Sequence, residues 1–569
     1  MDKKTLPIVI AVLIIVIFYW QILDYLDIVK RVPPKPDETQ VVDTIVQIAQ
    51  PSETTTEREE MPRVALPEPL ADTPEVPRES IDADTVVIRT DKYTVTLSSH
   101  GGGPVSIVLN EYAYRDGQPI EMLPQATGVT PEVSFAGGTY LTSSLNYRCN
   151  LQAGTYDVTR QPMEIVYTYT APHGGEIAKT YVFPPHEYHY DLQLSVSHTE
   201  AFGFERRYTM FWGTPLGTTE PDPKTDYEAM AAVVMRSGSR LDLDDFEDGQ
   251  LNQHEDGNAT WVGVRAKYFA AVMIPQNREA EAVLARGIKQ DRQTPNGEME
   301  VREITAGMDM PFARASNIDD RFTVFVGPLD YTLMSKYKVG LEDMLGIGTT
   351  PVIGWIIKPF AIAIIWILPK MHSVLPNYGI VIILFAFLVK VITLPLSLKS
   401  FKSMNAMKEL QPKIEQLKEK HKKNPQALNK EMMRMYKAHG VNPLSGCLPI
   451  LPQMPLFFAL FSVFRSTILL RDAPFVWFIT DLSRGATGIT DPYIILVVLM
   501  IITQFISQKL TMPTNQQQKA LLYLMPLFMG FIFYRFAAGL VLYWTCFSLF
   551  SLLDYFLFKR RKSAQVQAA

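Results

Sequence analysis

One lysine lies in the middle of a long apolar segment, and it is the first candidate for a functional side chain. Residues 378–396 contain no charged residue other than Lys390. A segment of this length can cross the ~30 Å hydrocarbon core of a bilayer, and a lysine at its centre costs roughly 2.5–3.5 kcal/mol. Lys390 is therefore either the cation of a water-filled cavity or a lysine that snorkels to the nearby membrane surface.

Polar side chains in the later apolar segments favour the cavity. Such groups need a partner or water inside the membrane, although each one alone could simply join two helices. Together they predict a hydrophilic substrate groove. Its candidate residues are Lys390, Gln453, Thr503, Gln504 and Thr545, with Ser507 and Ser548 as further polar groups.

Large apolar side chains are frequent in the same segments. Taken singly, each is an ordinary core or lipid-facing residue. They are Met454, Phe457, Phe458, Phe461, Phe528, Phe531, Phe536 and Trp544.

Histidines and cysteines give no catalytic or metal-binding pattern. His186 and His189 lack the spacing of a zinc-binding HExxH helix, and Pro184-Pro185 leads into an expected strand there. His100, beside three glycines, is an equally weak candidate for a sugar-acting catalyst. The three cysteines form no disulfide framework, and no GxxxxGK[ST] phosphate-binding loop occurs. We therefore expect no catalytic residue, no metal and no cofactor.

The rest of the chain must position these residues, and it begins with an apolar segment after Lys3 and Lys4. This segment ends in Phe18, Tyr19 and Trp20 without a small-residue cleavage site. Residues 1–25 are thus expected to be an uncleaved signal anchor rather than a removable signal peptide. Residues 26–83 are rich in Pro, Glu and Thr and predict an extended tether.

Residues 84–330 predict a large β-sandwich. Short runs rich in β-forming residues are separated by Gly and Pro, which is typical of a sandwich. The clearest runs are residues 93–97, 165–169, 188–196, 268–274 and 322–326. The anchor would deliver this domain to the outer side of the membrane.

Residues 331–374 are expected to hold connecting and interfacial helices, the first of them over 331–345. Residues 352–368 are apolar enough to cross a membrane, but Lys358 and Pro359 interrupt them. We favour a helix that lies in the interface, because this leaves the later loops with the correct charge bias.

Residues 398–441 predict a basic hairpin of two amphipathic helices. Residues 398–440 carry eleven basic and four acidic residues, a net charge of +7. Apolar residues at three- and four-residue spacing form one stripe before a break at Asn424-Pro425 and a second stripe after it. The hairpin lies either on anionic lipid or acts as a docking arm for ribosomes and incoming chains. Its candidate lysines are Lys399, Lys402, Lys408, Lys413, Lys418, Lys420, Lys422 and Lys423.

The later apolar segments predict four further spans over 442–558, at about 447–470, 492–508, 520–534 and 538–558. With a second span over 375–397 and the anchor, the chain would cross the membrane six times. The hairpin, the basic tail over 559–569 and both termini then lie in the cytoplasm, as the positive-inside rule requires. The predicted fold is a polytopic α-helical membrane domain of six spans plus a large periplasmic β-sandwich domain.

Several short motifs follow one another from the hairpin to the last span. They are Leu410-Gln-Pro-Lys-Ile414, Asn442-Pro-Leu-Ser-Gly-Cys-Leu-Pro449, Gln453-Met-Pro455, Leu470-Arg-Asp-Ala-Pro-Phe475, Asp481-Leu-Ser483, Asp491-Pro-Tyr493 and Gly539-Leu-Val-Leu-Tyr543. In this order they closely resemble the YidC membrane protein insertases of Gram-negative bacteria, within the Oxa-type insertase family. The anchor, the tether, the β-domain and Val326-Gly-Pro-Leu-Asp-Tyr331 extend the resemblance over essentially the full length.

The resemblance implies a groove that is open to the cytoplasm and to lipid, is closed on the outer side and contains one basic residue. Lys390 falls at that position, where family members usually have arginine. Lysine keeps the positive charge but lacks the planar five-donor fork of arginine. Residues that match the family's apolar substrate path are Met454, Phe457 and Trp544, to which we add Phe536 and Tyr543. The β-domain resembles sugar-mutarotase folds, a likeness that carries no activity.

The predicted function is ATP-independent insertion and folding of newly made inner-membrane proteins. Expected partners are nascent membrane proteins, the ribosome, the Sec translocon and membrane lipids, but no specific nucleic-acid sequence. Two other classes stay open. A channel or transporter would need a path to the outside, and the sequence offers no matched inverted repeat. A membrane-anchored sugar-acting enzyme would need catalytic carboxylates and histidines that converge in the β-domain.

Overall fold

The computed structural model describes residues 84–126, 128–135, 140–172, 174–202, 207–294, 297–312, 317–348, 353–421, 424–440, 450–511 and 516–567. The predicted signal anchor and tether lie outside these residues. Gln411–Gly440 belongs to one compact unit, whereas Asp82–Leu410 and Val441–Ala569 belong to another.

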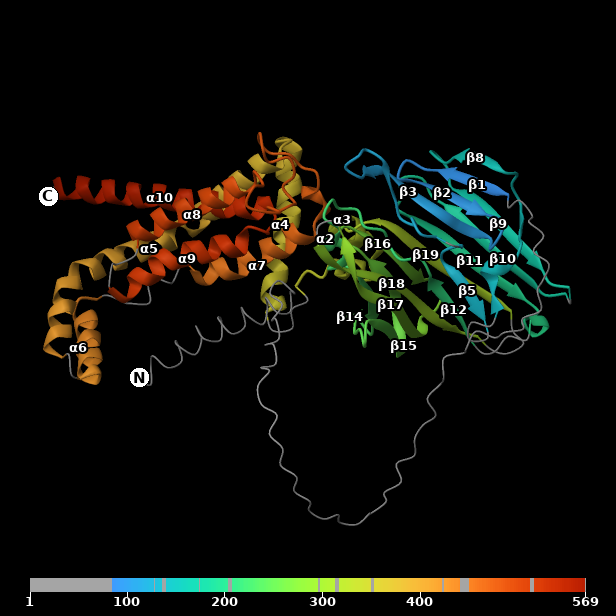
Figure 1. Cartoon of the computed structure of the whole chain (residues 1–569), viewed down its shortest axis with the longest axis horizontal. Helices are drawn as coiled ribbons and strands as arrows, with labels where there is room; N and C mark the ends of the chain where they lie inside the picture. The colour runs from blue at the N-terminus through green and yellow to red at the C-terminus, as the bar shows by residue number, and fades with distance from the viewer. Residues whose placement is uncertain are drawn as a thin grey trace, which may run out of the picture. The chain divides into compact units, whose positions relative to one another are not determined.

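Most residues between 85 and 328 form β-strands, which Figure 1 shows as one β-rich region. The strands are β1 (Thr85–Arg89), β2 (Tyr93–Ser98), β3 (Gly103–Ala113), β4 (Pro119–Glu121), β5 (Glu132–Phe135), β6 (Tyr140–Leu141), β7 (Arg148–Cys149), β8 (Gly154–Asp157), β9 (Met163–Thr170), β10 (Glu176–Phe183), β11 (His189–Ser197), β12 (Arg207–Trp212), β13 (Ala231–Arg236), β14 (Ser239–Leu243), β15 (Gln250–Arg265), β16 (Phe269–Pro275), β17 (Ala280–Thr294), β18 (Gly297–Pro311) and β19 (Ile318–Pro328). Short helices interrupt them at η2 (Thr142–Ser144), η3 (Thr199–Phe202) and α2 (Pro223–Tyr227). The five strand runs expected from the sequence correspond to β2, β9, β11, β16 and β19.

The strands form two sheets. The smaller has five strands in the order β4-β3-β2-β1-β8, and the larger has fourteen. The main path of the larger sheet is β6-β5-β12-β18-β17-β15-β16-β19-β11-β10-β9-β7, and β13 and β14 extend it from β15. Alternation along β10 and β11 buries every second residue, because successive side chains point to opposite faces of a strand.

Hydrogen bonds from buried side chains join the two sheets. Tyr93 in β2 donates its hydroxyl to the carbonyl of His189 in β11, at 2.9 Å. Lys179 in β10 donates to the carbonyl of Gly101 at 2.7 Å, and Tyr181 donates to Gly102 at 2.9 Å. Gly101 has a φ of +82°, and a Cβ there would lie 2.8 Å from Val129. The turn before β3 therefore requires glycine.

The segment that follows the β-region consists of short helical turns. They are α3 (Tyr331–Met334), η4 (Ser335–Tyr337) and η5 (Leu341–Leu345). The segment expected to be helical over 331–345 is therefore helical in short turns rather than in one continuous helix. Lys338 and Gly340 adopt left-handed backbone angles, with φ of 58° and 71°, and these angles end a right-handed helix.

The remaining described residues form longer helices. They are α4 (Gly354–Val374), α5 (Tyr378–Lys420), α6 (Pro425–Ala438), α7 (Ile450–Ser466) followed by η7 (Ile468–Leu470), α8 (Ile494–Thr511), α9 (Gln516–Phe533) and α10 (Ala538–Gln567). In the larger unit, α8 packs against both α9 and α10, and α4 packs against α7 (Figure 1). The second span and the first arm of the predicted hairpin form one continuous helix, α5, and α10 continues through most of the predicted tail.

Three described helices are long and apolar enough to cross a membrane, namely Gly354–Val374, Tyr378–Lys420 and Ala538–Phe556. Ile494–Leu510 and Leu522–Phe533 are shorter apolar helices. Length and composition thus allow α4 to cross a membrane as well as to lie along its surface. The count of six spans includes the N-terminal segment and stays a prediction.

Candidate functional site

Lys390 lies in α5 and is paired with an acidic residue of α10. Its Nζ atom lies 2.9 Å from Oδ2 of Asp554, donates a hydrogen bond to Oγ of Ser551 at 2.9 Å and lies 4.8 Å from the centre of the Phe547 ring. The Lys390 and Asp554 side chains are only 6% and 10% exposed. The cation is therefore satisfied inside the protein, by a charge-assisted hydrogen bond and a cation–π contact.

The spacing of residues along α10 explains this arrangement. Phe547, Ser551 and Asp554 are separated by four and three positions, so their side chains share one face of the helix. Sequence reasoning missed Ser551 and Asp554. The sequence did indicate Asp554 as a candidate partner, because it is the single acidic residue between 538 and 558. An ionisable residue in an apolar helix is expected to have a partner of opposite charge.

Two glutamines from other helices also hydrogen-bond to α10. Oε1 of Gln504 in α8 accepts from Nε1 of Trp544 at 3.2 Å and from Oγ of Ser548 at 2.9 Å. Gln453 in α7 donates from Nε2 to the hydroxyl of Tyr543 at 3.2 Å. Helix α10 is therefore the common partner of the predicted polar residues from α5, α7 and α8.

The two threonines in the predicted groove use their hydroxyls locally. Thr503 donates to the carbonyls of Leu499 and Met500, at 2.9 and 3.0 Å, and Thr545 donates to Val541 at 2.7 Å. A hydroxyl that donates to the carbonyl three or four residues earlier has its hydrogen-bond partner within its own helix. Both residues are buried, but the structure does not join them to the Lys390 pair through hydrogen bonds.

An aromatic cluster joins α7, the end of α9 and α10. Phe457 lies 5.3 Å from Trp544 and 5.6 Å from Phe533, measured between ring centres. Phe533 lies 5.1 Å from Phe536 and 5.7 Å from Trp544. Three residues of the predicted apolar path, Phe457, Phe536 and Trp544, thus gather around Phe533, which sequence reasoning did not select.

Tyr543 occupies a different environment from this cluster. It is fully buried, and its ring lies 6.1 Å from Phe385 of α5 and 6.0 Å from Phe547. With its hydroxyl bonded to Gln453, Tyr543 connects α5, α7 and α10 as a core residue. Met454 is half-buried on α7. The roles of Tyr543 and Met454 in a substrate path stay predictions.

The basic hairpin has the predicted break, and four residues of its first apolar stripe are buried. Asn424 caps α6 by accepting a hydrogen bond from the Ala427 backbone at 3.0 Å, with Pro425 in the first turn. The buried stripe residues are Phe401, Met404, Leu410 and Ile414. Lys399, Lys402, Lys413 and Lys420 are exposed, Lys408 and Lys418 are half-buried, and Lys422 and Lys423 lie outside the described residues.

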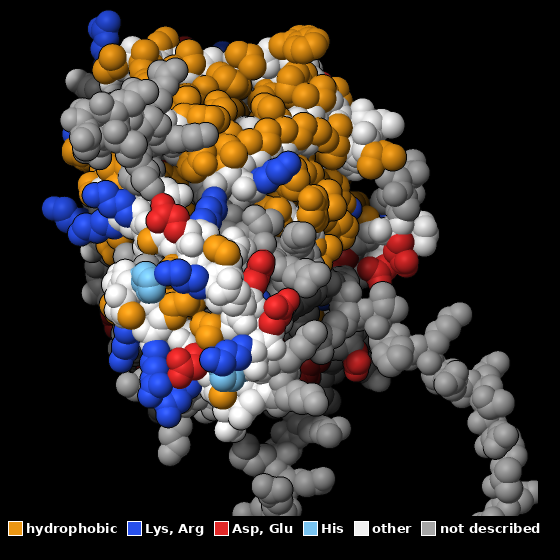
Figure 2. All heavy atoms as spheres, turned by 90° about the vertical axis from the view of Figure 1, so that its left-hand side faces the viewer, with side chains coloured by type: hydrophobic (Ala, Val, Ile, Leu, Met, Phe, Trp, Pro, Cys, Tyr) orange, Lys and Arg blue, Asp and Glu red, His pale blue; other side chains and the backbone are white. Residues whose placement is uncertain are grey.

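Figure 2 shows a group of exposed basic side chains. Lys413 lies 3.4 Å from His439, the residue that follows α6, so the two arms of the hairpin contact each other. Lys408 donates to the carbonyl of Leu510 at 2.8 Å. The exposed lysines leave a positively charged surface that can bind an anionic partner.

The loop between α7 and α8 explains two of the sequence motifs. Asp481 accepts from the backbone and hydroxyl of Ser483, at 2.8 and 2.7 Å. Asp491 accepts from Arg484 at 2.6 Å and from the backbone of Tyr493 at 3.0 Å. Tyr493 in turn donates its hydroxyl to the carbonyl of Asp481, at 3.0 Å. These residues hold the loop in one conformation.

A buried ion pair connects the β-region to the turn after α7. Nε of Arg471 lies 2.7 Å from Oε1 of Glu220, and the side chains are 6% and 7% exposed. Arg471 also donates to the carbonyl of Ala113 at 3.0 Å. The Leu470-Arg-Asp motif thus has a structural role that sequence reasoning had not assigned.

The histidines of the β-region have separate partners. His186 lies 3.0 Å from Asp91, whereas His189 lies 2.9 Å from the hydroxyl of Tyr337, and burial lowers the pKa of His189. His100 lies 2.8 Å from Asn146. Among the residues that the structure describes, no group of three metal-binding side chains could hold an ion.

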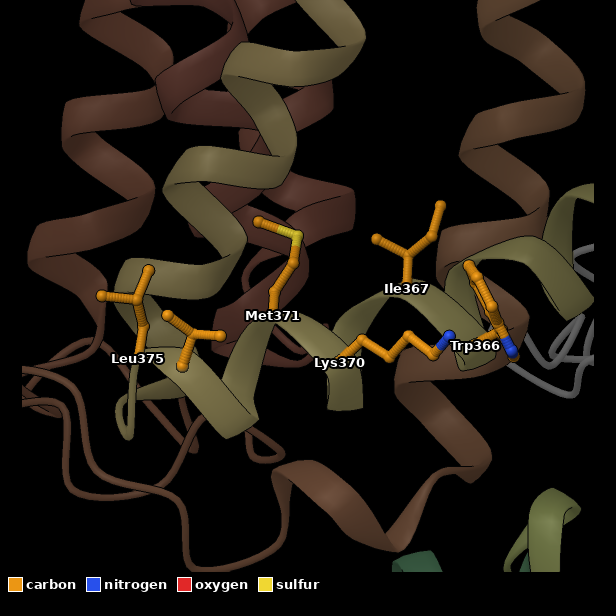
Figure 3. A pocket seen from close by; sticks show the side chains of 6 residues that line it. Trp366, Ile367, Lys370, Met371 and Leu375 are labelled. Atoms are coloured by element: carbon orange, nitrogen blue, oxygen red, sulfur yellow. The ribbon is translucent and has the colours of Figure 1, made fainter.

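A shallow pocket of about 360 Å³ lies along α4. Figure 3 shows that the Lys370 ammonium lies close to the Trp366 ring, and its Nζ atom is 3.4 Å from the ring centre. The lining residues are Trp366, Ile367, Lys370, Met371, Val374 and Leu375. None of the residues predicted for the groove lines this pocket.

Comparisons with known proteins cover nearly the whole described chain. The family model described as YidC periplasmic domain matches residues 85–363, and the one described as 60Kd inner membrane protein matches residues 370–565. The membrane protein insertase YidC of Chlorobaculum tepidum is 35% identical over 487 residues, which cover 82% of this chain and 80% of that protein. The YidC protein of Pelodictyon phaeoclathratiforme is 31% identical over 576 residues, which cover 98% of this chain and 94% of that protein. A crystal structure of an active YidC insertase, with the first transmembrane domain resolved, aligns with 83% of this chain and 94% of its own, at 18% identity and a TM-score of 0.35.

Proposed function

The chain belongs to the YidC family of membrane protein insertases, and we propose that it inserts new inner-membrane proteins through a hydrophilic groove that contains Lys390. The substrate is a newly made protein with one hydrophobic span and a short hydrophilic tail that must reach the outer side. The groove holds the tail in a polar environment part-way across the bilayer. This shortens the apolar distance that the tail must cross.

The convergence of polar side chains on α10 carries this proposal. Lys390, Gln453 and Gln504 come from three different helices, and each bonds to a side chain of α10. Polar groups in a membrane domain are costly unless they are paired or hydrated. A set gathered around one helix supports a functional site better than isolated helix–helix contacts would.

The aromatic cluster supports a neighbouring path for the hydrophobic span. Phe457 on α7, Phe536 between α9 and α10, and Trp544 on α10 belong to this cluster and offer large apolar faces. A span that leaves the groove along these faces would enter lipid. Transfer of its apolar surface out of water, at about 25 cal/mol per Å², provides the driving force, so no nucleotide is required.

The exposed lysines of the hairpin support a role in receiving the substrate. We propose that the hairpin contacts the ribosome or the incoming chain in the cytoplasm and also rests on anionic lipid. Both termini then lie in the cytoplasm and the β-domain lies in the periplasm. The protein works alone or with the Sec translocon, and it uses no cofactor.

Insertion into proteoliposomes that contain only this protein tests the proposal. The substrate is a single-span protein with a short tail, no nucleotide is added, and protection of the tail from protease reports insertion. We expect wild type and Lys390→Arg to insert the substrate and Lys390→Ala to lose most of this activity on acidic-tailed substrates. Equal activity of Lys390→Ala and wild type would refute the role of Lys390, and no insertion by wild type above empty liposomes would refute autonomous insertion.

A further inference from the structure

The groove cation already has a carboxylate partner within the protein. Lys390 and Asp554 lie 2.9 Å apart, and Ser551 donates its hydroxyl to the carbonyl of Phe547 while it accepts from Lys390. Both charged side chains are largely buried, so solvent screens their interaction weakly. The pair is a neutral unit rather than a free positive charge.

The pair lies on the inward face of α10. Leu553 and Phe556 lie on other faces of this helix and are 52% and 51% exposed, whereas Asp554 itself is buried. Asp554 thus points into the helix bundle, with its carboxylate turned toward Lys390 of α5. A tail that reaches Lys390 meets Asp554 at the same point.

A substrate carboxylate would have to displace one that is already in place. If the substrate bound Lys390 directly, Asp554 would lose its partner and remain buried with its charge. Removing one partner of a buried ion pair is strongly unfavourable, because the other charge is left uncompensated. The gain from the new contact is therefore largely cancelled by the loss of the old one.

From this we propose that Asp554 is a specificity-determining residue of the groove. It neutralises Lys390, so the protein accepts acidic, neutral and basic tails about equally and does not select for acidic ones. This inference rests on the proposed insertase groove and adds the class of tail that the groove accepts. An acidic tail is attracted by Lys390 and repelled by Asp554, whereas a basic tail is attracted by Asp554 and repelled by Lys390.

The test compares tails of one length that carry two Asp, two Asn or two Lys residues. Full-length protein is reconstituted in proteoliposomes without a membrane potential, and the ratio of acidic-tail to basic-tail insertion is measured. The variants are Asp554→Asn, Lys390→Gln and the double variant, with thermal unfolding in detergent as the control for folding.

We expect a ratio near one for wild type and for the double variant. Asp554→Asn should raise the ratio about tenfold and Lys390→Gln should lower it about tenfold, since close charge pairs commonly couple by at least this factor. If one single variant fails to fold, the change in the insertion ratio is measured on the other single variant and compared with the wild-type ratio.

Each failure has its own signature. A wild-type ratio above ten, or single variants that fold and keep the wild-type ratio, would overturn the specificity role of Asp554. Insertion by wild type in those experiments would leave the insertase proposal intact. Absence of insertion with all three tails would instead refute the proposed function itself.

Discussion

Replacement of Phe533 by alanine tests whether the aromatic cluster stabilises the packing of its helices. Phe533 is fully buried at the end of α9 and contacts Phe457, Phe536 and Trp544, with ring centres 5.1 to 5.7 Å apart. It therefore holds together three helices that contribute to the proposed path. Phe531, two residues earlier on the same helix, is 73% exposed and serves as the matched control.

The expected cost follows from the number of aromatic partners. In a membrane domain the apolar transfer term is small, because lipid is as apolar as the protein interior. Three aromatic pairs at about 0.5–1.5 kcal/mol each give a loss of about 1.5–4.5 kcal/mol for Phe533→Ala. Phe531 has one such contact, with Tyr534 at a distance of 6.3 Å between ring centres, so Phe531→Ala should cost less than about 1.5 kcal/mol.

Thermal unfolding of the full-length protein in detergent measures the stability of both variants, and proteoliposome insertion measures their activity. We expect Phe533→Ala to be clearly less stable than Phe531→Ala and to insert substrate more slowly. Equal stability of the two variants would show that the cluster contributes no packing energy. That result would refute the argument from the geometry of the cluster to a path for the hydrophobic span.

Two further predictions concern other parts of the chain. Burial lowers the pKa of Lys179 to about 7, from about 10.4 in an unfolded chain, so the folded state binds fewer protons and stability should rise with pH between about 7 and 10. Lys179→Met should abolish this rise in the unfolding midpoint, followed by tryptophan fluorescence, and an unchanged slope would contradict the assignment. Loss of the α6 cap in Asn424→Ala should cost about 1 kcal/mol of stability and speed hydrogen exchange in α6. The control Asn429→Ala should have neither effect, and equal exchange in both variants would contradict the capping role.

Local sequence patterns predicted the elements whose formation depends on interactions between residues close in the sequence. Strand alternation predicted β11, and Asn424-Pro425 predicted the start of α6. Both signals act over a few residues, through the period of a strand and the geometry of a helix cap. The segment expected to be helical over 331–345 is divided into short turns, because propensity did not reveal the left-handed backbone at Lys338 and Gly340.

Long-range pairing limited the prediction of the site. Lys390 was selected because a cation in an apolar helix usually faces protein or water, but the sequence alone did not show which residue would pair with it. Asp554 was identifiable as an isolated acid, yet only the packing of α10 brings it to α5. Phe533 resembles its exposed neighbour Phe531 in the sequence, and burial alone distinguishes the two.

The central claim is that the tail lies among the polar groups on α10 while the span passes the aromatic cluster. Photo-crosslinking during insertion tests it directly, with a reactive residue at Gln504 for the tail, at Met454 for the span and at Leu499, 48% exposed on α8, as the control. We predict tail crosslinks at Gln504, span crosslinks at Met454 and few at Leu499. Equal crosslinking at all three positions, or a tail that never reaches Gln504, would contradict the account.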